Sequence, residues 1–255
     1  MRTTLLVLGA ALIGGGALIA AAATTPSRIA SSAVTSESVE KAALGKEIRE
    51  YLIANPEVLV EAMQVLERKQ DGQREAVAQK AIREHKAELL NDPESPTGGN
   101  AGGDVTIVDF NDYQCPYCKR AHQAVKSVMS ADSKIRIVYK DLPILGETSR
   151  IAALAALAAV AQGKHLALHE ALMEASGKLD RARILEIAAS VGLDVARLEK
   201  DMEDPKFKQL IDRNLALAGA LGIRGTPAFV VGDQFVPGAI DADTLKQLVA
   251  NARKR

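Results

Sequence analysis

The chain has 255 residues, of which 47% are hydrophobic, and its 32 Lys and Arg residues balance 32 Asp and Glu residues. This composition can fill the core of a large domain, while the balanced charge offers no basic surplus for nucleic acid and no acidic tail. Aromatic residues make up only 3% and Trp is absent, so we expect an aliphatic core between closely packed helices.

The first 23 residues have the pattern of an export signal. Arg2 supplies a positive start, residues 5–23 carry no charge, and alanines at 20–23 suit a signal peptidase. We therefore expect a cleaved signal peptide at 1–23 and a mature protein in the periplasm or elsewhere outside the cytosol. An uncleaved membrane anchor is the alternative, because 19 apolar residues can just cross a bilayer. A Ser-, Thr- and Ala-rich linker at 24–38 follows.

Residues 39–90 are predicted to form a helical arm. One helix is expected at 40–54, and a second from 57 to about 90, with an interruption near Gly72. Leu59, Met63 and Leu66 follow one another at steps of four and three, the spacing of a coiled coil. So narrow an apolar stripe cannot form a core alone. It must pack against the domain that follows it or against copies of itself.

Two prolines and four glycines mark residues 91–103 as a second linker, so the main domain is expected at 104–255. The predicted order there is a strand at 105–110, a helix at 116–130, a strand at 134–140 and a helical block at about 147–220. Strands at 228–231 and 234–236 and a helix at 241–252 end the chain. This order predicts an α/β thioredoxin fold with an inserted helical subdomain.

The two cysteines of the chain lie in one run, Cys115-Pro116-Tyr117-Cys118, between the first predicted strand and the following helix. Unpaired N–H groups and the positive end of a helix stabilise a thiolate, so Cys115 is expected to be the nucleophile. Cys118, one turn further and more shielded, would resolve mixed disulfides. Pro116 suits the first helical position, and Tyr117 is expected to tune the pair. The pair is then the redox-active group, and no cofactor or metal is predicted.

The same spacing is compatible with a permanent disulfide or with half of a metal site. A disulfide across three positions closes a small loop and removes little entropy from the unfolded chain. A zinc site usually shows a second close pair of ligands. Here the histidines at 85, 122, 165 and 169 would have to supply them. We therefore favour the redox pair.

Two further residues complete the predicted site. Pro227 follows Thr226 directly before a strand, where a cis peptide bond would leave the Thr226 backbone free to pair with an extended client peptide. Asp109 ends the first strand within an apolar run, six positions before Cys115 (115 − 109). Buried under the helix, it would have a raised pKa and could relay the Cys118 proton through water. The alternative is a solvent-facing carboxylate.

Residues from about 104 to 255 resemble the DsbA-type thiol:disulfide oxidoreductases of the thioredoxin superfamily. The resemblance rests on Asp109-Phe110, Asp112-Tyr113-Gln114 before the cysteine run, Lys140-Asp141-Leu142-Pro143, and Leu221-Gly222-Ile223 leading into Gly225-Thr226-Pro227-Ala228-Phe229. It implies that Cys115 is the attacking thiol, Cys118 the resolving thiol, Pro227 the cis-proline and Asp109 the buried acid.

The arm at 39–90 resembles the N-terminal extension of ScsC-like proteins, which implies trimers that favour disulfide isomerisation. We therefore expect a periplasmic oligomer that isomerises or reduces disulfides in unfolded or misoxidised secreted proteins, kept reduced by a DsbD-like membrane partner. The first alternative is a monomeric DsbA-like oxidase recharged by a DsbB-like partner. The second is a non-catalytic adaptor that binds peptides near Pro227 or copper(I) at the thiol pair.

Overall fold

The computed structural model describes residues 36–254, with side-chain surroundings from residue 39 onward. The predicted signal peptide at 1–23 and most of the predicted linker at 24–38 lie outside the described residues. The chain divides into two compact units, Met1–Val60 and Glu61–Arg255. None of the helices within residues 36–254 combines the length and the apolar character that crossing a bilayer requires.

The N-terminal unit contains α1 (Ser36–Ala54). The last three residues of the predicted linker, 36–38, therefore belong to this helix. The Asn55 backbone N–H and side-chain amide both donate to the Tyr51 carbonyl, at 2.8 and 2.9 Å. The helix ends there because Pro56 disfavours a helical conformation at the residue before it. After Pro56, α2 (Glu57–Glu84) begins and runs through Gly72 without a break. The interruption predicted there is wrong, because one glycine costs a helix only about 1 kcal/mol.

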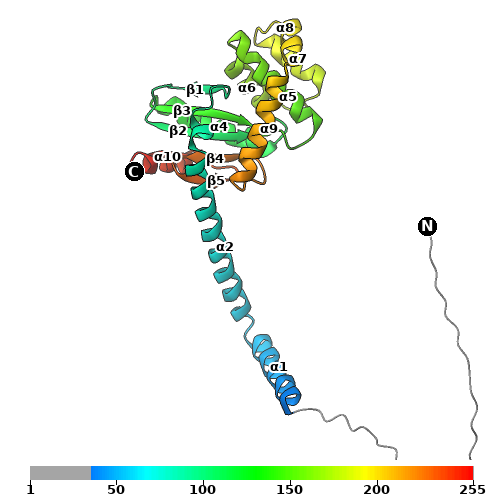
Figure 1. Ribbon diagram of the computed structural model, residues 1–255, viewed down its shortest axis with the longest axis vertical. Helices are drawn as coiled ribbons and strands as arrows, with labels where there is room; N and C mark the ends of the chain where they lie inside the picture. Colours follow the sequence, from blue (N-terminus) through cyan, green and yellow to red (C-terminus); the bar gives the residue numbers. More distant parts are fainter. Residues whose placement is uncertain (1–35, 255) are drawn as a thin grey trace, which may run out of the picture. The chain divides into compact units, whose positions relative to one another are not determined.

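A five-stranded sheet with the order β1-β3-β2-β4-β5 forms the centre of the C-terminal unit (Figure 1). Its strands are β1 (Thr97–Gly99), β2 (Val105–Asn111), β3 (Ile135–Asp141), β4 (Ala228–Val231) and β5 (Gln234–Pro237). Strands β2 and β3 run parallel and are joined through α4 (Pro116–Ala131). Strand β4 pairs antiparallel with both β2 and β5. The predicted thioredoxin fold is confirmed.

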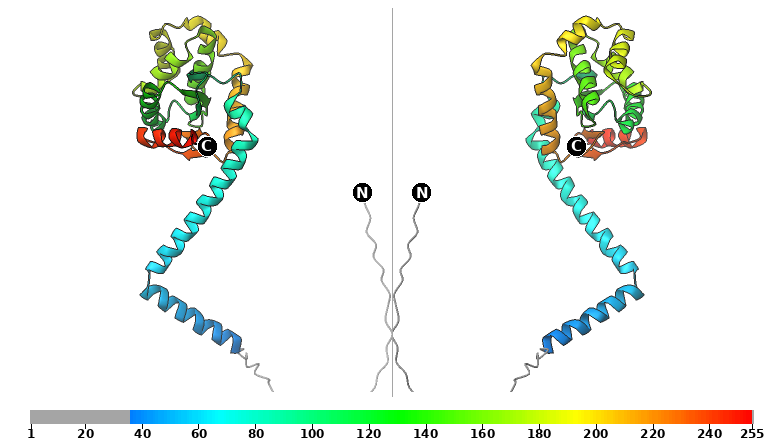
Figure 2. Two further views of the ribbon diagram at one scale, coloured as in Figure 1. Left: turned by 90° about the vertical axis from the view of Figure 1, so that its left-hand side faces the viewer. Right: turned by 90° about the vertical axis from the view of Figure 1, so that its right-hand side faces the viewer.

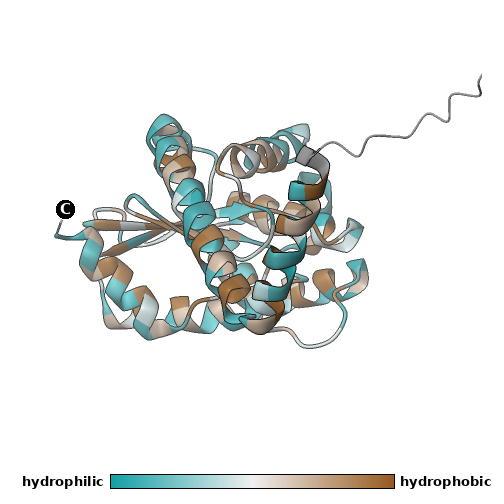
Figure 3. Cartoon of the chain, turned by 90° about the horizontal axis from the view of Figure 1, so that it is seen from below, coloured by the Kyte–Doolittle hydropathy of each residue, from teal (hydrophilic) through white to brown (hydrophobic). Residues whose placement is uncertain are grey.

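Helices cover both faces of this sheet. Because successive strand residues point to opposite faces, Ile107 packs with α4 and with α10 (Ala242–Ala252), whereas Val108 packs with α3 (Lys86–Leu90) and α9 (Pro205–Ala220). Figure 2 shows α9 in orange and α10 in red on these two sides. Hydrophobic and hydrophilic residues are interspersed along the helices (Figure 3). For the helices that cover the sheet, this pattern is expected because one side of each is buried.

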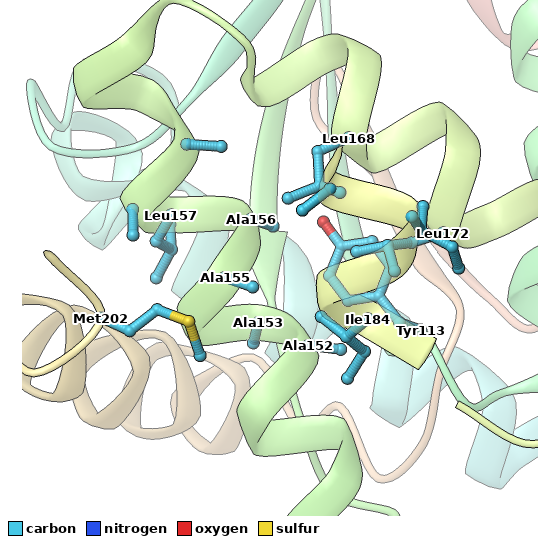
Figure 4. Packing of buried hydrophobic residues seen from close by; sticks show 14 of the residues in the cluster. Tyr113, Ala152, Ala153, Ala155, Ala156, Leu157, Leu168, Leu172, Ile184 and Met202 are labelled. Carbon is cyan, nitrogen blue, oxygen red and sulfur yellow. The ribbon is translucent and has the colours of Figure 1, made fainter. Parts of the chain in front are cut away.

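The inserted helical subdomain is confirmed between β3 and β4. It consists of α5 (Glu147–Ala158), the 3-10 helix η1 (Ala159–Gln162), α6 (His165–Glu174), α7 (Arg181–Ser190), α8 (Val195–Asp201) and α9. Buried alanines at 152, 153, 155, 156 and 158 let neighbouring helices approach α5 closely. Tyr113, from the loop after β2, inserts its ring among Leu168, Leu172 and Ile184 of this subdomain (Figure 4).

The segment predicted as a linker at 91–103 is packed onto the domain. Its strand β1 pairs antiparallel with the edge of β3, and the buried Lys140 donates to Asp92 at 3.1 Å and to Ser95 at 2.7 Å. Gly99 has a φ of +69° and lies against the Ile135 carbonyl, so no side chain fits there. Ile82 and Leu89 also belong to the sheet's core. The compact unit therefore starts well before residue 104.

Candidate active site

Cys115 is the N-cap residue of α4. Strand β2 ends at Asn111, the chain turns, and Pro116 occupies the first turn of the helix, where a missing N–H costs nothing. The Cys115 sulfur accepts the N–H of Cys118 at 3.4 Å. The nucleophile predicted from sequence therefore sits among the unpaired N–H groups that favour an anion. Tyr117 is 56% exposed, and the Arg120 guanidinium lies 5.3 Å from the centre of its ring.

Both cysteines are free thiols in the structure and shielded from solvent. Cys115 is 4% exposed and Cys118 is 2% exposed. Burial raises the pKa of the Cys118 thiol well above its ordinary value, although hydrogen bonds with the Asp112 backbone and with the Thr226 side chain act in the opposite direction. The Cys118 thiol is therefore protonated at neutral pH, and it must lose this proton before its sulfur can attack a mixed disulfide.

The loop before β4 closes over the cysteine pair. The Thr226–Pro227 peptide bond is cis, and the Cys115 thiol donates to the Thr226 carbonyl at 3.2 Å. The Pro227 carbonyl accepts the N–H of Gly238 at 2.9 Å. The structure therefore brings together Cys115, Cys118, Thr226 and Pro227, which come from two segments more than 100 positions apart in the sequence.

Asp109 lies inside the protein on the α4 side of the sheet. It is 5% exposed, and its Oδ1 atom has no hydrogen-bond partner. Burial raises the pKa of this carboxyl to about 7, and its charge also contributes to the raised pKa of Cys118. The alternative of a solvent-facing carboxylate is wrong. Its proposed role as a proton relay remains a prediction.

Several buried polar groups near Asp109 were not singled out as site residues. Asp141 lies on the same face of the neighbouring strand, and burial together with the charge of Asp109 raises its pKa to about 7. Tyr113 Oη and His169 Nδ1 lie 3.0 Å apart. Burial raises the pKa of Tyr113 and lowers that of His169, so both are neutral. The site is therefore backed by a buried polar layer in which Tyr113 and His169 are neutral and the carboxyls of Asp109 and Asp141 titrate near neutral pH.

The histidines considered as metal ligands fall into two groups. The ring centre of His169 lies 5.3 Å from that of His122 and 5.9 Å from that of His165, whereas His85 pairs with Glu88 on the surface. Among residues 36–254, no three His, Cys, Asp or Glu side chains are arranged to hold a metal ion.

The fold and the cysteine pair define a class of protein, the thioredoxin-like oxidoreductases. The model of the DSBA-like thioredoxin domain matches residues 106–250, and the chain belongs to this family. The model of the copper resistance protein ScsC N-terminal domain matches residues 40–73. The chain therefore combines a DSBA-like thioredoxin domain with an N-terminal segment similar to that of ScsC proteins, as the sequence resemblance predicts.

Solved structures agree with this assignment. A thioredoxin-like oxidoreductase from Silicibacter pomeroyi DSS-3 is 50% identical, with a TM-score of 0.65, over 66% of this chain and 98% of the other. ScsC of Proteus mirabilis is 32% identical, with a TM-score of 0.64, over 85% and 98%. The thiol-disulfide exchange protein α-DsbA2 of Wolbachia pipientis is 31% identical, with a TM-score of 0.66, over 70% and 97%.

Curated relatives are longer. The Na+/H+ antiporter NhaA 1 of Salinispora arenicola is 31% identical over 150 residues, which are 58% of this chain and 23% of that protein. The chain thus spans less than a quarter of the length of that relative.

Proposed function

We propose that this protein is an extracytoplasmic disulfide isomerase or reductase that acts on misoxidised secreted proteins as an oligomer. The observation that carries the proposal is the Cys115 sulfur at the start of α4, 3.4 Å from the Cys118 N–H and 3.2 Å from the Thr226 carbonyl. An export signal at 1–23 would place this dithiol where protein disulfides form.

The reaction begins when the Cys115 thiolate attacks one sulfur of a client disulfide. A bond forms between Cys115 and that sulfur, the client's disulfide breaks, and its second sulfur leaves as a thiolate. If this thiolate attacks a different disulfide of the client, another client sulfur is released as a thiolate. When that thiolate attacks the mixed disulfide and displaces Cys115 as a thiolate, the client is isomerised without net oxidation. If Cys118 attacks Cys115 instead, the client leaves reduced and the enzyme becomes a disulfide.

Asp109 is the proposed base of the second route. Its carboxylate would take the Cys118 proton as the Cys115–Cys118 bond forms, through water. A pKa of about 7 leaves a substantial fraction of this carboxyl ionised at neutral pH. A membrane electron donor of the DsbD type would then return two electrons and two protons to the cysteine pair.

The proposed clients are unfolded chains with apolar segments. Tyr117, Ile144 and Leu145 are 56%, 42% and 52% exposed. Tyr117 lies within the cysteine run. The backbone N–H groups of Ile144 and Leu145 donate to the carboxylate of Asp112, which lies in the loop before the cysteine run. These side chains therefore offer an apolar rim beside the reactive sulfur, and apolar contact is non-directional enough to accept many sequences.

The helical arm supports an oligomer. Its exposed large hydrophobic side chains are Val39, Leu44, Ile48, Tyr51, Ile53, Leu59, Val60, Met63, Val65, Leu66 and Val77, each at least 50% exposed. So many exposed apolar side chains indicate an interaction surface, and the ScsC N-terminal model covers most of them. The end of the arm, including Ala81 and Ile82, packs onto the domain. We propose that residues 39–77 associate with copies of themselves, as a trimer.

The test combines molecular mass, refolding of a scrambled disulfide substrate, and thiol state in cells. We expect the mature protein to be an oligomer, to reactivate the scrambled substrate, and to carry mostly reduced cysteines when cells are alkylated. A monomer with mostly oxidised cysteines would identify an oxidase instead. An oligomer without thiol exchange would indicate a binding adaptor.

A further inference from the structure

Asp112 occupies the turn between β2 and the cysteine pair and is 1% exposed. Its carboxylate accepts three backbone N–H groups. Oδ1 accepts from Gln114 at 2.8 Å, and Oδ2 accepts from Ile144 at 2.9 Å and from Leu145 at 3.0 Å. One buried side chain therefore joins the loop before the cysteines to the loop after β3.

The backbone of Asp112 contacts both cysteines. Its carbonyl accepts the N–H of Cys115 at 3.0 Å, and its own N–H donates to the Cys118 sulfur at 3.4 Å. A hydrogen bond to sulfur favours the ionised form of a thiol that burial otherwise keeps protonated. The direction of this N–H depends on the turn that the Asp112 carboxylate holds in place.

We propose that Asp112 is a positioning residue for the resolving step: its carboxylate fixes the turn so that its backbone N–H stabilises the Cys118 sulfur as that sulfur attacks the mixed disulfide. This role rests on the proposed thiol–disulfide exchange. A donor already aimed at the atom where negative charge develops needs no reorganisation during the reaction.

Atoms and electrons balance in this step. Cys118 gives its proton to the Asp109 carboxylate and attacks the Cys115 sulfur, forming the Cys115–Cys118 bond. The bond between Cys115 and the client sulfur breaks, and the client leaves as a thiolate that takes a proton from water. Two electrons pass from the cysteine pair to the client. The Asp112 N–H donates to the Cys118 sulfur while it carries charge and changes no bond.

This role predicts that the two chemical steps respond differently to substitution. Capture of a client disulfide by Cys115 uses the start of α4, and we expect Asp112→Asn to leave the start of this helix in place. Release uses Cys118. Asn keeps the shape of the Asp112 side chain, but its NH2 group must face at least one of the three N–H groups. A purely structural role would slow both steps together or neither.

The experiment measures both rates at neutral pH with a disulfide-bonded model peptide. Capture is followed in full-length protein carrying Cys118→Ala, with and without Asp112→Asn, as accumulation of the mixed disulfide. Release is followed with Cys118 present. Asp112→Ala is tested in parallel, with Asp194→Ala as the matched control. The Asp194 carboxylate likewise accepts one backbone N–H, from Arg197 at 3.0 Å, but caps α8.

We expect Asp112→Asn to slow release roughly 10- to 100-fold, the range for a lost hydrogen bond to a charged group, and to change capture by less than about threefold. Asp194→Ala should change neither rate. Circular dichroism confirms that each variant is folded, and Asp112→Asn alone decides the question if Asp112→Ala does not fold. Equal slowing of both steps, or unchanged release, would overturn the role. If the Cys118→Ala protein with Asp112 intact captures no peptide, the proposed function fails first and this role falls with it.

Discussion

Replacing Asp109 by Asn is expected to remove a pH-dependent cost to stability. Burial raises the pKa of Asp109 from an ordinary value of 3.8 to about 7. In the folded protein this carboxyl therefore keeps its proton at pH values where the unfolded chain has already released it. The folded state is favoured below pH 4, and this advantage is lost progressively as the pH rises to about 7.

The size of the effect follows from the same values. A rise from 3.8 to about 7, at about 1.4 kcal/mol for each tenfold change in proton affinity, corresponds to about 4 kcal/mol. The charge of Asp109 also raises the pKa of Asp141, so removing it relieves a second cost in the same pH range. The free energy of unfolding of Asp109→Asn, relative to the unsubstituted protein, should therefore increase by up to about 4 kcal/mol between pH 4 and pH 8.

Urea unfolding of the reduced proteins at matched concentration, from pH 4 to pH 9, measures this difference. The change in the free energy of unfolding with pH is the diagnostic quantity, because the buried Asn amide adds a penalty that does not vary with pH. Asp204→Asn is the control. Lys206 lowers the pKa of the exposed Asp204, so the contribution of Asp204 to stability changes only below pH 4. Above pH 4, the free energy of unfolding of Asp204→Asn should therefore run parallel to that of the unsubstituted protein. A parallel curve for Asp109→Asn would refute the reasoning.

Three further sets of substitutions test the packing and the arm. Lys140→Met should destabilise the protein by about 3 kcal/mol in urea unfolding, because it leaves Asp92 without its buried partner. The double substitution Lys140→Met with Asp92→Asn should destabilise the protein by less than the sum of the two single substitutions. Gly99→Ala should cost at least about 1 kcal/mol, because alanine is strained at positive φ and would meet the Ile135 backbone. Replacing Ile48 and Leu66 by Ser should lower the molecular mass measured by light scattering toward that of a monomer, without changing thermal unfolding of the catalytic unit. An unchanged molecular mass would contradict the proposed self-association through the arm.

The sequence predicted the main elements of the fold well where local patterns are strong. The run at 105–110 is apolar on both faces because β2 lies in the middle of the sheet, and the strand at 228–231 matches β4 in the structure. Strand β1 was missed. Its residues, Thr97-Gly98-Gly99, carry no apolar alternation. They pair because β3 has a free edge and because only glycine fits against Ile135.

The residues of the candidate active site likewise fall into those with a local sequence signal and those whose contacts depend on tertiary structure. The cysteine run and Thr226-Pro227 are local motifs, and the structure brings them together. The contact between Tyr113 and His169 joins residues 56 positions apart and has no local signal. In the sequence, Asp112 is part of the Asp112-Tyr113-Gln114 motif and carries no signal of its own for a role at the site. Its hydrogen bond to the N–H two residues later is a known preference of Asp in turns, so a turn could have been predicted there. Its contacts with Ile144 and Leu145 depend on tertiary structure.

The central claim is that Cys115 exchanges disulfides with client proteins and that Cys118 releases them. Its most direct test is to express the full-length Cys118→Ala protein and to separate cell proteins without reducing agent. We predict adducts that disappear on reduction and are absent when Cys115→Ser is added. If no reducible adduct forms, or if adducts persist without the Cys115 sulfur, the claim is contradicted.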